Sequence, residues 1–261
     1  MPTATNDGVT LCYETTGDGP TVAFVEPVGY GAWCWSWLVD ALGERFERLV
    51  WDLRGTGRSD APAGPYDVAT LASDLEAVLH AHGAGDVHLV GAGLGGMVAL
   101  QYALGGTRAS TLTLLGTTAD GARVDAAALN ALGAPRDDPD ALRESLRGAF
   151  SAGVVDDHPE IVDRIVEWRR EDDAGAAARE AQAAAMTDFD TTDSLYEITT
   201  PVLVCHGRAD GVVPVAAGER LAEGLPRGEF RPVEAGHLVA VEEPAVVEAE
   251  LFAFLDDHAD V

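Results

Sequence analysis

Hydrophobic positions along the chain alternate between two kinds of pattern. Short apolar runs bounded by turn residues, such as residues 21–25 (TVAFV), are typical of strands buried in a parallel sheet. Apolar residues at helical spacing, as over residues 68–82, predict amphipathic helices. These patterns predict further strands at residues 9–13, 49–51, 87–90, 112–115, 201–205 and 229–233, and helices at residues 94–104 and 244–255. Such alternation predicts an α/β fold with a mostly parallel central sheet flanked by helices on both faces.

One long stretch, residues 120–190, breaks this alternation. It is rich in Ala, Asp and Arg, and its clearest helical segments are residues 139–150 and 159–170. Each of these segments opens with a proline, which suits the first turn of a helix. We therefore predict a single α/β domain over residues 1–261 with a helical lid inserted at residues 120–190. An ordinary large connection without a gating role is the alternative.

The charge balance narrows the set of partners. The chain has 44 acidic residues against 17 basic ones, a formal net charge of −27, and no lysine. Such a surface repels phosphates, so we expect neither nucleic acid nor an anionic membrane as a partner. Salt screens carboxylate repulsion, so this composition favours an origin in a salt-rich cytoplasm, while a GC-rich genome would also favour Arg over Lys.

Targeting and disulfide signals are missing from the sequence. The first residues, MPTATNDGVT, have neither a basic segment nor an apolar one, and no run of about 18 apolar residues exists. Three cysteines are too few and odd in number for a disulfide framework. We expect a cytoplasmic protein without a membrane span.

The most informative segment joins a predicted strand to a predicted helix through a glycine-rich turn, residues 87–97 (VHLVGAGLGGM). Its form is that of the nucleophile elbow G-x-S-x-G, with Gly91 and Gly95 as the flanking glycines and Gly93 at the nucleophile position. The turn also partly matches the dinucleotide motif G-x-G-x-x-G. That motif requires an acidic residue at the end of the next strand, where the chain has Gly116 and Thr117 instead. We therefore predict no cofactor.

Three further segments resemble the α/β-hydrolase family. They are residues 52–60 (DLRGTGRSD), residues 202–210 (VLVCHGRAD) with a following Val-Pro pair, and residues 234–237 (EAGH) with a following Glu-Pro pair. The family's order of elbow, acid and histidine is kept. The resemblance implies an α/β-hydrolase fold in which Asp210 is the acid and His237 the histidine, while Gly93 replaces the nucleophilic serine.

The residues themselves agree with these roles. Asp210 and His237 each follow a predicted strand, at the carboxyl edge where sites of open parallel sheets lie. A carboxylate that accepts from one imidazole nitrogen leaves the other nitrogen free to act as a base. Considered singly, each residue could equally be a solvated loop residue. Asp120 follows another strand and is the competing candidate for the acid, but its flanking motif is less complete.

Two backbone amides are candidates for an oxyanion hole, those of Leu94 and Val28. Leu94 follows the elbow position, and Val28 lies in the loop after residues 21–25, where family members usually carry a His-Gly pair. This chain has Glu26 and Pro27 there, and proline has no amide hydrogen. A carboxylate at Glu26 would oppose a developing oxyanion unless it is protonated or turned away.

The aromatic stretch of residues 33–37 (WCWSW) lies close to this predicted site. Trp33 and Trp35 either line an apolar pocket or pack beneath the lid. Cys34 is either a functional thiol or, as is commoner, a small buried side chain. The histidines outside the site show no metal-ligand spacing with acidic or thiol partners, so we predict no metal.

Three functions remain open at this stage. The first is a hydrolase that acts on an ester, lactone or similar carbonyl of a small apolar substrate, with the His237–Asp210 dyad activating water. The second is a non-hydrolytic enzyme (a lyase, isomerase or cofactor-free oxygenase) that uses His237 as a base. The third is a catalytically inactive protein that binds a small apolar ligand. An engineered glycine is disfavoured, because the Glu26–Pro27 pair departs from the family as well. Nothing in the sequence indicates the oligomeric state.

Overall fold

The computed structural model describes residues 1–258. Its centre is an eight-stranded sheet in the order β1-β2-β4-β3-β5-β6-β7-β8. β1 pairs antiparallel with β2, and β2 antiparallel with β4, whereas the pairings from β4 to β8 are parallel. The strands are β1 Thr3–Asn6, β2 Val9–Thr16, β3 Thr21–Val25, β4 Glu47–Trp51, β5 Val87–Ala92, β6 Ala109–Leu115, β7 Val202–Gly207 and β8 Gly228–Val233.

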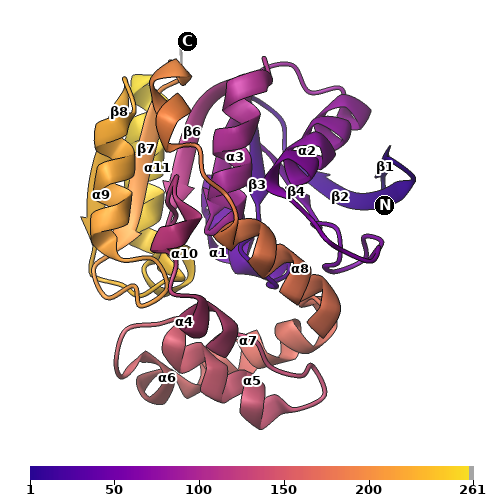
Figure 1. Ribbon diagram of the computed structural model, residues 1–261, viewed down its shortest axis with the longest axis vertical. Coiled ribbons are helices and arrows are strands. Elements are labelled where there is room, and N and C mark those ends of the chain that lie inside the picture. Colours follow the sequence, from indigo (N-terminus) through magenta and orange to yellow (C-terminus); the bar gives the residue numbers. More distant parts are fainter. Residues whose placement is uncertain (259–261) are drawn as a thin grey trace.

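Helices cover both faces of this sheet. α2 and α3 pack on each other, and α1 packs on α11; Figure 1 shows α2, α3 and α9 in front of the sheet with α1 and α11 behind it. These helices are α1 Ser36–Leu42, α2 Val68–His82, α3 Leu94–Gly105, α9 Val215–Gly224, α10 Val239–Glu242 and α11 Pro244–Asp257. The predicted α/β fold with a mostly parallel sheet is confirmed.

The segment between β6 and β7 is helical. It contains α4 Ala126–Ala131, α5 Pro139–Ser145, α6 Val154–Asp157, α7 Pro159–Asp172 and α8 Ala176–Thr187, with short 3-10 turns η2 Gly121–Arg123, η3 Leu146–Gly148 and η4 Thr192–Glu197. An isolated bridge joins Asp120 to Asp190, so the two ends of the segment meet at its base. Figure 1 shows α4 to α7 gathered below the carboxyl edge of the sheet, with α8 running back toward the core.

A buried ion pair fixes the loop that follows β4. Arg54 donates from Nε and Nη2 to the two carboxylate oxygens of Asp74 on α2, each at 2.6 Å, and both side chains are buried. Gln182 of α8 donates to the Arg54 carbonyl and to Thr56 Oγ1, each at 3.0 Å. Because bidentate guanidinium–carboxylate pairs have a fixed geometry, this loop is a rigid base on which α8 rests.

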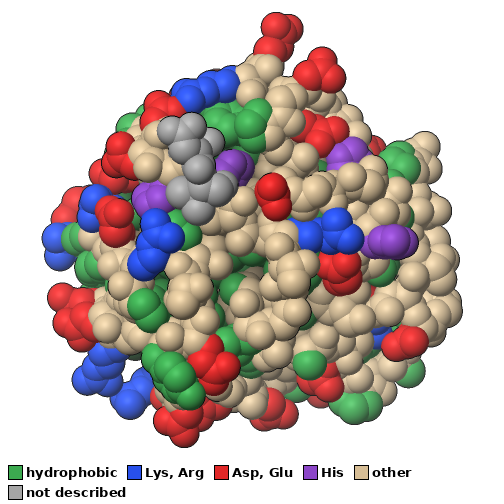
Figure 2. Space-filling view, turned by 90° about the horizontal axis from the view of Figure 1, so that it is seen from above, with side chains coloured by type: hydrophobic (Ala, Val, Ile, Leu, Met, Phe, Trp, Pro, Cys, Tyr) green, Lys and Arg blue, Asp and Glu red, His purple; other side chains and the backbone are tan. Residues whose placement is uncertain are grey.

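Acidic side chains are spread over the surface. Figure 2 shows red carboxylate groups all around one face, with the fewer blue arginine side chains interspersed among them. Within residues 1–258, no helix is both long enough and apolar enough to cross a membrane.

Candidate active site

The elbow between β5 and α3 has a conformation that glycine adopts easily. Gly93 has φ +50° and ψ −114°, in the region that favours glycine. Its amide donates to the Leu115 carbonyl at 2.9 Å, and its carbonyl accepts from Thr117 Oγ1 at 2.6 Å. The neighbouring strand β6 and the residues after it therefore hold the turn in place.

The three elbow glycines differ in what surrounds them. A Cβ on Gly91 would lie 2.3 Å from the Gly95 carbonyl oxygen, and one on Gly95 would lie 2.0 Å from the Val25 carbonyl oxygen. Neither contact is tolerable. A Cβ on Gly93 would lie 3.4 Å from Pro27 Cβ and 3.5 Å from His237 Nε2, which is ordinary van der Waals distance. Packing thus requires glycine at the two outer positions and leaves room for a side chain at the central one.

The structure brings His237 and Asp210 together. Asp210 follows β7 and His237 follows β8, and His237 Nδ1 lies 2.9 Å from Asp210 Oδ2. Both residues are buried. Asp210 Oδ1 accepts from the amides of Val212 at 2.8 Å and Val213 at 2.9 Å. The carboxylate is therefore fixed by its own loop before it meets the imidazole.

These contacts set the protonation of the pair. Burial alone would raise the pKa of Asp210, but the charge of His237 and hydrogen bonds from His206 and His237 outweigh burial and lower it. Asp210 is therefore an acceptor, and the hydrogen-bond network assigns a proton to His237 Nδ1. The lone pair of His237 then lies on Nε2, which faces the space above Gly93.

His206 is a member of this site that the sequence analysis missed. It is fully buried, and its Nε2 lies 2.8 Å from the Val213 carbonyl oxygen and 3.4 Å from Asp210 Oδ2. A carbonyl only accepts, so Nε2 carries a proton that also faces the carboxylate. The signal that the sequence carries is its position, four residues before Asp210 in the same segment.

The loop carrying Val28 faces the elbow. Pro27 is a nearest neighbour of the Gly93 side-chain position, and Leu94 begins α3, whose first amides have no partner within the helix. Residues of the helical segment between β6 and β7 hold the loop: the Gly29 amide donates to Gln182 Oε1 at 2.7 Å, and the Ala174 amide donates to the Gly29 carbonyl at 2.9 Å. The two candidate oxyanion amides therefore belong to segments that adjoin the Gly93 side-chain position, which His237 Nε2 also faces.

Glu26 lies beneath this loop and not in an open pocket. Its side chain is fully buried, and Oε2 accepts from the Leu53 amide at 3.0 Å. Within residues 1–258, Oε1 has no hydrogen-bond partner. Burial first, and the nearby Asp52 second, raise the pKa of Glu26 well above its usual value. The carboxyl group thus favours the neutral form and points toward the segment after β4.

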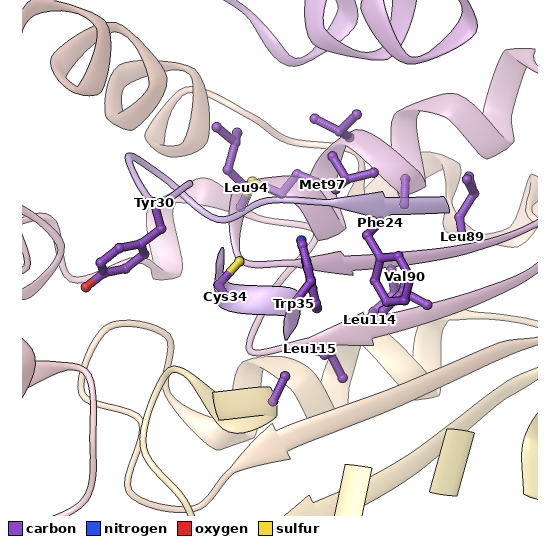
Figure 3. Close-up of a cluster of buried hydrophobic side chains, with 14 of the residues drawn as sticks. Phe24, Tyr30, Cys34, Trp35, Leu89, Val90, Leu94, Met97, Leu114 and Leu115 are labelled. Atoms are coloured by element: carbon purple, nitrogen blue, oxygen red, sulfur yellow. The ribbon is translucent and has the colours of Figure 1, made fainter. Parts of the chain in front are cut away.

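The two tryptophans pack instead of lining an open pocket. Trp33 donates from Nε1 to Asp173 Oδ1 at 2.9 Å and stacks on Trp168 of α7, with ring centroids 6.3 Å apart. Trp35 packs on Phe24 at 5.2 Å between centroids, inside the core shown in Figure 3. Trp33 therefore packs against the helical segment between β6 and β7, whereas Trp35 packs in the core against β3.

Asp120 lies away from the histidine. It accepts from the Ala122 amide at 2.9 Å and pairs with Arg123 at 3.0 Å, at the start of η2. The carboxylate that reaches His237 is that of Asp210. Cys34 is buried, and burial raises the pKa of its thiol well above the usual value, which disfavours the reactive thiolate. Over residues 1–258, no three His, Cys, Asp or Glu side chains are arranged to hold a metal ion.

Comparison with known proteins agrees with this architecture. The sequence profile of the alpha/beta hydrolase fold family matches residues 27–244. A putative carbamate hydrolase RutD from Variovorax paradoxus is 35% identical over 259 residues, covering 94% of this chain and 96% of the relative. The 3-oxoadipate enol-lactonase 2 of Acinetobacter baylyi is 27% identical, covering 93% and 91%.

A solved structure is similar over the whole length. The crystal structure of a hydrolase from Pseudomonas aeruginosa superposes with a TM-score of 0.85 at 29% identity, covering 97% of this chain and 96% of that one. The fold, the elbow with its two required outer glycines and the family match lead to one conclusion. The chain belongs to the alpha/beta hydrolase fold family.

Proposed function

We propose that this protein hydrolyses a reactive acyl bond, of the enol-lactone or enol-ester type, by attack of a water molecule that His237 deprotonates. The observation that carries the proposal is the position of His237 Nε2. It lies 3.5 Å from where a Cβ on Gly93 would be, on an imidazole whose other nitrogen is hydrogen-bonded to Asp210. A base must be within hydrogen-bond reach of the proton it takes, and a water above Gly93 satisfies this condition.

In the proposed reaction, water gives one proton to His237 Nε2 while its oxygen forms a bond to the acyl carbon. The carbonyl oxygen becomes an oxyanion, which the amides of Leu94 and Val28 stabilise. The tetrahedral intermediate then collapses and breaks the bond to the leaving enol oxygen. His237 returns its proton to that oxygen, and the products are a carboxylic acid and an enol, which tautomerises to a ketone.

The large rate contribution of the absent serine indicates which substrates this site could hydrolyse. Removal of a triad serine typically lowers kcat by about a millionfold and leaves about a thousandfold acceleration over water. A leaving group that departs easily compensates for part of this loss, and an enolate is a far better leaving group than an alkoxide. The enol-lactonase among the relatives favours the same class, whereas the carbamate hydrolases favour a related carbonyl.

Hydrolysis of α-angelica lactone, a small enol-lactone, tests the proposal. We expect turnover that follows saturation kinetics and falls to the background rate in His237→Ala. The matched control is His80→Ala, since His80 is an exposed histidine on α2 and its replacement leaves the rate unchanged. A fluorophosphonate probe should leave the protein unlabelled, because no serine occupies the elbow.

Equal rates in the wild type and His237→Ala would contradict the proposal, as would covalent labelling at the elbow. His237-dependent exchange of a substrate C–H proton without hydrolysis would indicate the non-hydrolytic base chemistry instead. Saturable ligand binding without any turnover would indicate a binding protein.

A further inference from the structure

A groove of about 640 Å³ opens in the lid, between the residues that follow α4 and the start of α8. We call it the lid groove; its lining includes Asn130, Gly133, Arg136, Ala174, Gly175 and Arg179. Its volume is within the range of about 300–1,000 Å³ that small-molecule sites occupy. His237 and Gly93 do not line it. A ligand in this groove would therefore reach the dyad only past whatever forms its inner wall.

Arg179 forms part of that wall. Its side chain passes between two glycines: a Cβ on Gly29 would lie 2.8 Å from its Cγ, and a Cβ on Gly133 would lie 2.7 Å from its Nε. The guanidinium then donates from Nη2 to the Leu129 carbonyl at 2.7 Å. Gly29 adjoins Val28, and consecutive Cα atoms are about 3.8 Å apart. Arg179 thus contacts both the lid groove and the loop that carries a candidate oxyanion amide.

The charge of Arg179 lacks a partner. Within residues 1–258 it forms no ion pair, although the chain has 44 acidic residues for 17 arginines. The nearby Asp173 is already held by Arg169 at 2.7 Å and by Trp33 at 2.9 Å. Burial lowers the pKa of Arg179, and the charge of Arg169 acts in the same direction. A half-buried cation with four unused N–H donors is suited to bind an anion.

We propose that Arg179 binds the carboxylate of a small acyl substrate with a single negative charge, so that the scissile carbonyl lies a few bonds away, beside Val28. The exposed carboxylates of Asp137 and Glu180 also line the lid groove and disfavour ligands of higher charge. This inference rests on the proposed function for the reaction that follows, but the binding of the anion can be measured without it.

Two esters of equal length test the kinetic consequence. They are mono-4-nitrophenyl adipate, which carries one carboxylate, and 4-nitrophenyl hexanoate, which carries none. We expect the ratio of their kcat/KM values to fall by about tenfold or more in Arg179→Met, mainly through KM, because hydrogen bonds to charged groups are the strong ones. Arg179→Lys keeps the charge and should retain most of the preference. Arg227→Met removes an exposed arginine far from the lid and should leave the ratio unchanged.

Binding of monomethyl adipate, measured by calorimetry, separates this inference from the proposed function. We expect it to bind the wild type and Arg227→Met, and to bind Arg179→Met at least about tenfold more weakly. Dimethyl adipate, which is neutral, should show no such difference. Binding that depends on Arg179 without hydrolysis of either ester would support the anion site and contradict the proposed function. An unchanged ester ratio together with equal binding to Arg179→Met would overturn the inference while leaving the hydrolase intact.

Discussion

Position 93 differs from positions 91 and 95 in having room for a side chain. A serine there would place its Cβ at ordinary contact distance from Pro27 and His237, and its hydroxyl within reach of His237 Nε2. We expect Gly93→Ser to raise ester hydrolysis by at least about a hundredfold, since the serine is the largest missing contribution. It should also make the protein react with a fluorophosphonate probe.

Gly93→Ala is the matched control for this substitution. It adds the same Cβ at the same positive φ, so both variants bear a strain of about 1–2 kcal/mol. Only the serine supplies an attacking oxygen. Equal activity in the two variants would mean that the remaining machinery does not assemble a working triad.

The raised pKa of Glu26 leads us to expect that the stability of the protein depends on pH. Its pKa is raised in the folded state, chiefly by burial, so the folded protein binds its proton more tightly than the unfolded chain does. That stabilisation is present below the unfolded pKa and is lost as pH rises toward the folded value. Glu26→Gln cannot ionise and does not lose this stabilisation. The free energy of unfolding of the variant minus that of the wild type should therefore increase with pH above pH 4.5, by at most about 1.4 kcal/mol per pH unit.

Urea unfolding of both proteins across pH 4 to 8 measures this difference. Glu234→Gln is the control, because that side chain is exposed and paired at the surface with Arg208. A constant difference between Glu26→Gln and the wild type over this interval would show that Glu26 ionises in the folded state as it does in the unfolded chain.

At the scale of elements, one carboxylate joins the helical segment between β6 and β7 to the loop that follows β3. Asp173, just after α7, accepts from Arg169 Nε at 2.7 Å, from Trp33 Nε1 at 2.9 Å and from the Gly31 amide at 3.3 Å. It is 5% exposed, and Arg169 is 2% exposed. We expect Asp173→Ala to lower the free energy of unfolding by about 3–5 kcal/mol, because it leaves a buried guanidinium without its carboxylate.

The adjacent Asp172 provides the comparison. It is only half-buried, and within residues 1–258 its carboxylate forms no ion pair, whereas Asp173 is paired with Arg169. Asp172→Ala should therefore cost far less than Asp173→Ala, as denaturant unfolding can measure. Equal losses in the two variants would mean that Asp173 does not anchor the lid.

Elements with a strong local pattern were predicted from the sequence to the residue. β3 and α2 have the predicted bounds. β3 is a continuous apolar run, and α2 begins at Val68, directly after Asp67, whose side chain caps the helix. β1 and α1 were missed because they are short, with 4 and 7 residues, whereas α9 was missed although its ten residues are amphipathic. Asp210 and His237 were assigned through the resemblance of their segments to the α/β-hydrolase family, and their places after predicted strands agree with that assignment.

Contacts between residues far apart in the chain could not be predicted from the sequence. Trp33 and Asp173 are 140 residues apart, so no local pattern distinguishes a tryptophan that anchors the lid from one that lines a pocket. The same holds for Arg179 of α8, which contacts the loop that carries Val28 through its packing on Gly29. His206 was missed although it lies four residues before Asp210, because it stands inside an apolar strand, whereas the other polar residues of the site follow strands.

At the scale of the whole molecule, the net charge of −27 predicts a dependence of stability on salt. Carboxylates outnumber arginines, so the thirteen arginine–carboxylate pairs within residues 1–258 leave most acidic groups without a cation. Self-repulsion destabilises the compact state. The Debye length falls from about 10 Å at 0.1 M salt to about 3 Å at 1 M, so added salt screens this repulsion.

We propose that the protein is adapted to high salt and expect its melting temperature to rise steadily between 0.05 M and 1 M KCl. Screening and general salt effects can be separated by pH. Near the sequence pI of about 4.3 the net charge is small, so KCl should raise the melting temperature much less there than at pH 7. Equal melting temperatures in dilute buffer and molar KCl at pH 7 would contradict the adaptation. In that case the acidic composition would reflect only residue usage, because charge repulsion would have no measurable share in the free energy of folding.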